Sequence, residues 1–156
     1  MAFTDIYSIA GSAMTAQTVR LNTIASNLAN ADAVASNPND AYKALKPVFA
    51  TVYSQTQLSA DKDVYPNAEV RIVDVVQHDG KVDKRFEPNN PLANDEGYVF
   101  YPGIDVVAEM ADMMSATRSY ETNVEVLANV KSMQQGLLRL GRVADELSTI
   151  YRLVRG

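Results

Sequence analysis

The first 41 residues carry only four charged side chains, although apolar and small residues recur through them at helical spacing. Thr4 is suited to cap the start of a helix and the Asn-rich stretch ending at Asn37–Asn39 to stop it, so the pattern predicts a helix over residues 4–30. The recurring positions, alternately four and three residues apart, are Ile6, Ala10, Ala13, Gln17, Leu21, Ile24, Leu28 and Ala31.

A helix with one face in water normally carries Lys and Glu on that face, and this segment has almost none. The helix is therefore expected to be contacted on most sides. One interpretation is the central helix of a monomeric bundle; the other is a helix that packs against neighbouring subunits. The chain has few other apolar helices to surround it, which favours the second interpretation.

The middle of the chain is strongly charged, with 16 charged residues between Tyr42 and Pro102, and its pattern is that of β-structure. Val48–Tyr53 and Glu69–Val76 are rich in β-branched residues, and Tyr98–Tyr101 is a short aromatic strand. The dipeptide at residues 79–80, Asp-Gly, predicts a tight turn after which Lys81–Phe86 returns alongside the second strand. We expect a β-rich module over residues 42–102.

After Pro102-Gly103 the spacing becomes helical again, which predicts a long amphipathic helix over residues 105–140, roughly 54 Å at 1.5 Å per residue. Asp105 and Glu109 suit its beginning, and Arg139 and Arg142 suit its end. A further amphipathic stretch follows Gly141, without an assigned role. The fold class is therefore α+β. The helical positions are Val106, Met110, Met113, Thr117, Tyr120, Val124, Leu127, Lys131, Gln134 and Leu138.

The composition excludes several classes of function. With no Cys and a single His, the chain has no disulfide, no thiolate metal site and no cluster of histidine ligands. A net charge of -5 without a basic cluster argues against nucleic acid as a partner, and the absence of a long apolar run argues against direct membrane insertion. We expect no catalytic residues, no metal and no cofactor.

The remaining candidates for chemistry are weak. Asp61 and Asp63 alternate with a lysine as in half of a cation-binding loop, and Glu121 and Glu125 lie one helical turn apart. His78 precedes the predicted turn and is expected to face solvent. A small enzyme that uses Asp61, Asp63 or Asp74 is one alternative function, and a soluble coiled-coil adaptor that forms a closed oligomer is another.

The distinctive segments resemble a known family. Leu21–Ala31, which reads LNTIASNLANA, resembles the N-terminal motif of flagellar axial proteins of the rod, hook and filament. Gly97-Tyr98-Val99 and the pattern from Glu109 to Glu125 are more specifically similar to the FlgC family of proximal-rod proteins of the bacterial flagellar basal body. The resemblance covers residues 1–141, and residues 142–156 extend past the usual end of the family.

The resemblance implies a structural subunit of the proximal rod that is exported without a cleavable signal peptide and polymerises into a periplasm-spanning helical drive shaft that transmits torque. The alternative within the same superfamily is another flagellar axial protein, such as another rod subunit. The implied partners are copies of the chain, other rod subunits, MS-ring and rod-junction proteins, and the flagellar export apparatus. Residues 1–41 and 103–141 would form an inner coiled-coil layer, residues 42–102 an outer module and residues 142–156 a tail. The implied subunit-interface residues are Ile6, Leu21, Ile24, Asn27, Leu28, Asn30, Val106, Met110, Met113, Tyr120, Val124, Leu127 and Leu138.

Overall fold

The computed structural model describes residues 3–54 and 67–154, so the predicted loop at Asp61 and Asp63 lies outside the described residues. The chain begins and ends with a long helix, and the segment between them forms two small antiparallel sheets, which confirms the α+β class. The elements in chain order are α1 (Phe3–Ala29), β1 (Leu45–Ser54), β2 (Asn67–Gln77), β3 (Asp83–Phe86), β4 (Tyr98–Tyr101) and α2 (Val106–Val154).

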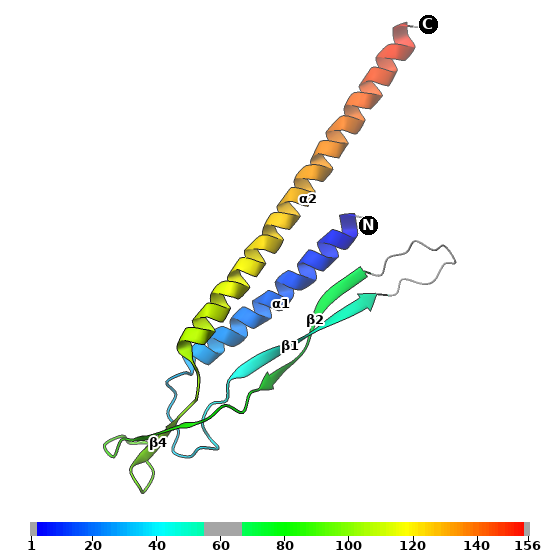
Figure 1. Ribbon diagram of the computed structural model, residues 1–156. Helices are drawn as coiled ribbons and strands as arrows, with labels where there is room; N and C mark the ends of the chain where they lie inside the picture. Colours follow the sequence, from blue (N-terminus) through cyan, green and yellow to red (C-terminus); the bar gives the residue numbers. More distant parts are fainter. Residues whose placement is uncertain (1–2, 55–66, 155–156) are drawn as a thin grey trace.

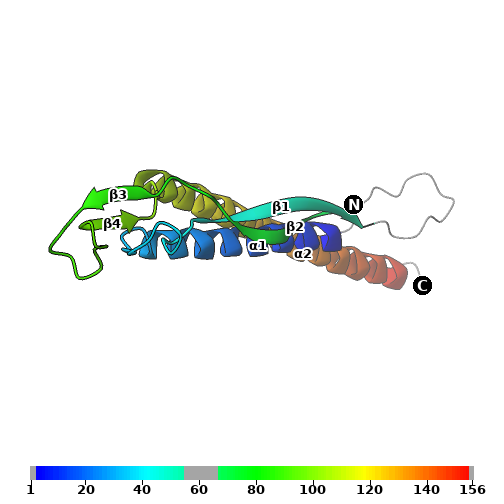
Figure 2. The same ribbon diagram turned by 90° about the horizontal axis from the view of Figure 1, so that it is seen from below.

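The N-terminal helix is confirmed to within one residue at each end. It begins at Phe3, so Thr4 lies in its first turn and not at the cap. Helix α1 lies between α2, which runs antiparallel to it, and the hairpin formed by β1 and β2 (Figures 1 and 2). Both of these elements therefore depend on α1 for their packing.

Helix α2 begins where the sequence predicts but continues much further. The Oδ1 atom of Asp105 accepts hydrogen bonds from the backbone N–H groups of Val107 (3.0 Å) and Ala108 (3.1 Å), which caps the helix. The predicted end near residue 140 is wrong, since the stretch after Gly141 continues the same helix to Val154. As Figure 1 shows, α2 consequently runs well past the N-terminal end of α1.

The predicted hairpin at residues 79–80 is also wrong. Strand β2 pairs with β1, from Leu45 opposite Gln77 to Ser54 opposite Asn67, and β3 pairs instead with β4. The two long strands match each other in length, and that pairing leaves Asp79-Gly80 as a connection between two sheets. Lys43 Nζ lies 2.7 Å from Asp79 Oδ1, and this hydrogen bond and charge lower the pKa of the Asp79 carboxyl group.

The connection after α1 joins the second sheet. Ala35 and Phe100 exchange backbone hydrogen bonds of 2.9 and 3.0 Å, so one residue of this connection pairs with β4. Val99, next to Phe100 on β4, is fully buried. Elsewhere the buried apolar residues are mostly small, including Ala10, Ala16 and Ala116. The core within one subunit is therefore thin.

The segment between β2 and β3 crosses the segment between β4 and α2 in close contact. A Cβ atom built on Gly103 would lie 1.7 Å from the backbone oxygen of Lys81. Because that neighbour is backbone and not a flexible side chain, only glycine fits at the crossing. This contact fixes the position of the β3–β4 sheet at the start of α2.

We predict that Gly103→Ala lowers the free energy of unfolding by about 1–3 kcal/mol, the usual cost of forcing a methyl group into a filled space. Urea denaturation of the purified chain measures this. Gly136→Ala is the matched control, because its Cβ would meet nothing within 4 Å. Replacing glycine by alanine in a helix interior stabilises the folded protein by up to about 1 kcal/mol. Equal stability of the two variants would show that the crossing is loose.

Candidate assembly surface

The structure divides the predicted interface residues into three groups. Ile24 and Asn27 are buried within the subunit. A second group is half-buried and consists of Ile6, Leu21, Leu28, Asn30, Met113, Tyr120 and Leu127. The exposed group consists of Val106, Met110, Val124 and Leu138.

The Asn27 side chain joins three parts of the chain. Its Nδ2 donates to the backbone oxygen of Leu45 (2.9 Å) and to Oε2 of Glu109 (3.2 Å). Its Oδ1 accepts from the backbone N–H of Leu45 (2.8 Å) and from the hydroxyl group of Tyr42 (3.1 Å). Every donor and acceptor of the carboxamide is thus used, which allows the side chain to be only 1% exposed.

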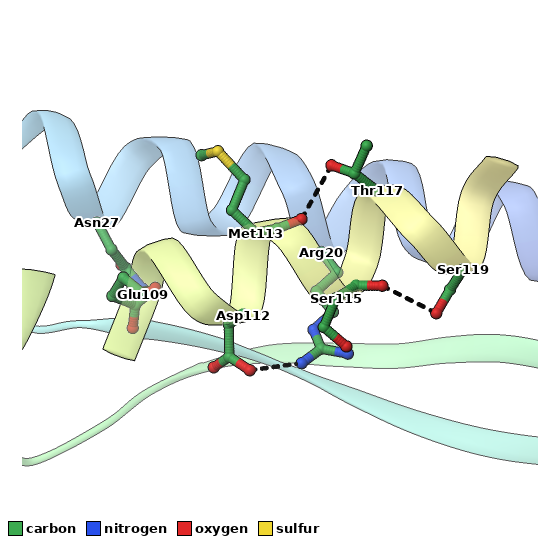
Figure 3. Close-up of polar contacts among 8 residues, drawn as sticks. All are labelled: Arg20, Asn27, Glu109, Asp112, Met113, Ser115, Thr117 and Ser119. Carbon is green, nitrogen blue, oxygen red and sulfur yellow. Dashed lines mark hydrogen bonds and ion pairs between the residues drawn. The ribbon is translucent and has the colours of Figure 1, made fainter. Parts of the chain in front are cut away.

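A second polar contact ties α1 to the start of α2. Arg20 Nη2 lies 2.8 Å from Oδ1 of Asp112, one turn along α2 from Glu109 (Figure 3). Arg20 is the only basic residue before Lys43, so its position in a neutral helix was a signal of a specific partner. The roles of Tyr42, Glu109 and Asp112 in this cluster had no comparable signal in the sequence.

The side of α2 that faces α1 differs from the predicted stripe. Four predicted positions on this side are half-buried: Met113, Tyr120, Leu127 and Gln134. The Oε1 atom of Gln134 accepts a hydrogen bond from the hydroxyl group of Tyr7 (3.3 Å). The other positions on this side, also seven residues apart, are Glu109, Ala116, Asn123 and Val130. Small residues on both helices, such as Ala116 on α2, allow the two helix backbones to pack close together.

The other half of the predicted stripe is not covered by any other element among residues 3–54 and 67–154. These residues are exposed, recur every seven residues and form the α2 outer stripe: Met110, Thr117, Val124, Lys131 and Leu138. Met110 is 54% exposed and Leu138 is 75% exposed. Three of the five, Met110, Val124 and Leu138, are apolar and lie two heptads apart, and exposed apolar side chains in heptad register are typical of a coiled-coil contact.

The face of α1 directed away from the core is small and uncharged. It is formed by residues at alternating steps of four and three, the α1 outer stripe: Gly11, Thr15, Thr18, Asn22, Ala25 and Ala29. The hydroxyl groups of Thr15 and Thr18 donate to the backbone oxygens of Gly11 (3.0 Å) and Met14 (2.9 Å) in the preceding turn. With these donors satisfied inside the helix, the stripe can be covered by another helix at little cost in lost hydration.

The candidates for chemistry are not brought together. All four are exposed: Asp74 lies on β2 and His78 directly after it, whereas Glu121 and Glu125 lie on α2, which in the described part of the chain does not contact β2. Within residues 3–54 and 67–154, no group of three or more acidic or histidine side chains could hold a metal ion. In the same ranges, no helix combines the length and the apolar character needed to cross a membrane.

Two family models match the chain. The model described as "Flagella basal body rod protein" matches residues 8–35, which include most of α1. The model described as "Flagellar basal body rod FlgEFG protein C-terminal" matches residues 95–140, which include β4 and most of α2. The matches thus fall on the two helices that carry the outer stripes.

Relatives match over most of their length. The chain is 46% identical to the flagellar basal-body rod protein FlgC of Escherichia coli O6:H1 over 142 residues, covering 91% of this chain and 100% of the relative. It is 43% identical, with the same coverage, to FlgC of Salmonella typhimurium. It is 32% identical to FlgC of Bacillus subtilis, covering 86% of this chain and 95% of the relative.

We predict that Asn27→Ala lowers the free energy of unfolding by on the order of 2–3 kcal/mol, because the backbone groups of Leu45 lose their partners. Asn22→Ala, on the exposed side of the same helix, is the matched control and should cost far less. Urea denaturation of both variants provides the comparison. Equal losses would contradict a structural role for the carboxamide.

Asn27→Asp keeps the size of the side chain but removes both donors and places a carboxylate beside Glu109. Burial and the Glu109 charge raise the folded-state pKa of the introduced group above its unfolded value of about 4. The folded state then binds the proton more tightly than the unfolded state. The loss of unfolding free energy relative to wild type therefore shrinks as the pH falls through the raised pKa. Thermal unfolding at neutral and mildly acidic pH measures this, and a pH-independent loss would contradict it.

Proposed function

Since the chain belongs to the FlgC family of flagellar basal-body rod proteins, we propose that it is a structural subunit of the proximal rod, whose two outer stripes pack against neighbouring rod subunits. The observation that carries this proposal is the α2 outer stripe. Its large apolar side chains are spaced for helix packing and have no partner within the described part of the subunit. A neighbour that covers them completes a core that one chain leaves thin.

The α1 outer stripe, on the other long helix, supports the same proposal. Its small residues let another helix approach closely, and its threonine hydroxyls are already bonded. A contact between unlike faces of successive copies does not close on itself, so it extends a helical assembly. Such an assembly of interlocked helices transmits torque as a drive shaft.

We propose the same inner and outer arrangement that the resemblance implies. The helical segments 1–41 and 103–141 form the inner layer, the strands within residues 42–102 face outward, and residues 142–156 form a tail. The contrast between four charged residues in the first 41 and 16 in residues 42–102 supports this, because charges favour the hydrated side. Partners are then copies of the chain, other rod subunits and the MS-ring and rod-junction proteins next to them.

We propose that the chain reaches the periplasm-spanning rod through the flagellar export apparatus with its N-terminus intact. The first turns of α1 support this because they belong to the fold. The hydroxyl group of Tyr7 donates to Gln134, and that of Ser8 donates to Oε1 of Glu69 at 2.5 Å. Cleavage within Ala10–Ala13, where small residues imitate a signal-peptidase site, would remove these contacts.

We propose a mechanical role without catalysis. The exposed positions of Asp74 and His78 at β2 and of Glu121 and Glu125 on α2, two elements that do not contact each other within the described residues, support it, because acid–base chemistry requires such groups to converge.

Met110→Asp and Val124→Asp are predicted to abolish incorporation into the rod while leaving the subunit folded, because both positions are exposed in the subunit and covered only by a neighbour. The measurements are swimming in soft agar by a strain that expresses only the variant, and immunoblots of isolated basal bodies. Circular dichroism of the purified variants tests folding.

Thr122→Asp is the matched control, since it adds the same charge to α2 on the side that already carries Arg118 and Glu125. This variant should swim normally. Normal swimming by Met110→Asp and Val124→Asp would refute the assignment of the α2 outer stripe, and a purified chain that forms a closed oligomer of fixed mass would favour the adaptor.

A further inference from the structure

Helix α2 carries an apolar surface beyond the end of α1. The hydrogen bond between Tyr7 and Gln134 lies near the last turn of α2 that α1 covers. From there α2 continues to Val154, roughly 30 Å at 1.5 Å per residue, a segment we call the α2 overhang (residues 135–154). Leu137, Leu138 and Leu140 on it are 54%, 75% and 68% exposed. A soluble helix keeps such a cluster of leucines only where something covers it.

The same part of α2 is basic. Arg139 and Arg142 are exposed, and residues 135–142, the part of the overhang whose side chains the structure describes, contain no other charged residue. Arginines near a helix C-terminus often serve to offset the helix dipole, but that effect is confined to the last turn. Arg139 and Arg142 lie roughly three to four turns before the end of α2 at Val154, so the dipole does not account for them.

The opposite end of the molecule has the complementary character. Figures 1 and 2 both place β3 and β4 at the end away from the C-terminus. Residues 78–105, which we call the acidic tip, contain six Asp or Glu against three Lys or Arg. Two of these cations are held on the tip itself: Lys84 Nζ lies 3.8 Å from the centre of the Tyr98 ring, and Arg85 Cζ lies 4.4 Å from that of Tyr101.

The acidic tip also has an apolar hollow. Phe86, Pro88 and Pro91 line a shallow depression beside β3, and Phe86 is 63% exposed. Glu87 lines the same depression, and Asp83 and Asp95 are exposed on the tip. The tip therefore presents apolar rings among carboxylates, as the overhang presents leucines among arginines.

We propose that the α2 overhang of one copy docks on the acidic tip of a second copy, with its leucines in the hollow and its arginines beside the carboxylates. This contact deepens the proposed function and rests on it. Unlike ends of two copies meet, so the contact repeats along an axis without closing. It differs from the lateral packing of the outer stripes, with which it shares only Leu138, and its charges set the head-to-tail direction in which copies join.

Sedimentation equilibrium of the purified full chain tests the contact. Between about 0.01 M and about 1 M salt the Debye length falls from roughly 30 Å to roughly 3 Å, so the dissociation constant for self-association should rise at least about tenfold. Arg139→Glu combined with Arg142→Glu should raise it at low salt, and so should Asp83→Lys combined with Asp95→Lys. Each reversal leaves like charges facing each other.

Mixing the two reversed proteins is the decisive measurement. The reversed overhang of one then meets the reversed tip of the other, and the two unchanged surfaces also meet, so association should return to the wild-type level. Lys46→Glu combined with Arg71→Glu changes the net charge by the same amount on exposed hairpin positions and should leave association unchanged.

Several outcomes would overturn the docking. They are a wild-type chain that stays monomeric at about millimolar concentration, association unaffected by both reversals, and a mixture that does not recover. Binding of the overhang to phosphatidylglycerol vesicles without self-association would likewise replace the second copy with a membrane surface. None of these results bears on the α2 outer stripe, because Met110→Asp and Val124→Asp test incorporation into the rod independently.

Discussion

The buried carboxamide of Asn27 is the interaction on which the arrangement of this subunit depends. It binds both backbone groups of Leu45, as a neighbouring strand would, and so determines where the hairpin begins against α1. Through Glu109 it also sets the starting point of α2. Because all of its hydrogen bonds are made within the chain, Asn27 orders the subunit internally and leaves the outward faces of the helices for other contacts.

Those outward faces show how a helix with almost no charge remains compatible with water before it is covered. Threonine hydroxyls on α1 bond to the turn before them, and Thr117 and Ser119 on α2 do the same, at 2.9 and 3.0 Å (Figure 3). A threonine bonded in this way presents mainly its methyl group. Such a surface tolerates solvent, yet it loses little hydration when another helix covers it.

The sequence predicted those features that depend on local periodicity. The three-and-four spacing located both helices, β-branched residues located β1 and β2, and aromatic residues located β4. Pairing of the strands was not predictable in the same way, because the dipeptide at residues 79–80 favours a turn locally while the long β1 partner decides where β2 lies. The Asn27 cluster escaped prediction for a similar reason: its partners are backbone groups of Leu45 and a carboxylate 82 residues further along the chain.

The position of α1 between the hairpin and α2 has a mechanical consequence. A chain pulled from its N-terminus peels α1 away from both neighbours at once, beginning at Tyr7 and Ser8, where single side-chain hydrogen bonds are the polar contacts. The hydrogen bond from the Val70 N–H to Ser12 and then the Arg20 ion pair follow, and the four hydrogen bonds of Asn27 come last. Resistance to pulling therefore increases along α1. Once the hydrogen bonds of Asn27 break, both the hairpin and α2 lose the helix against which they pack.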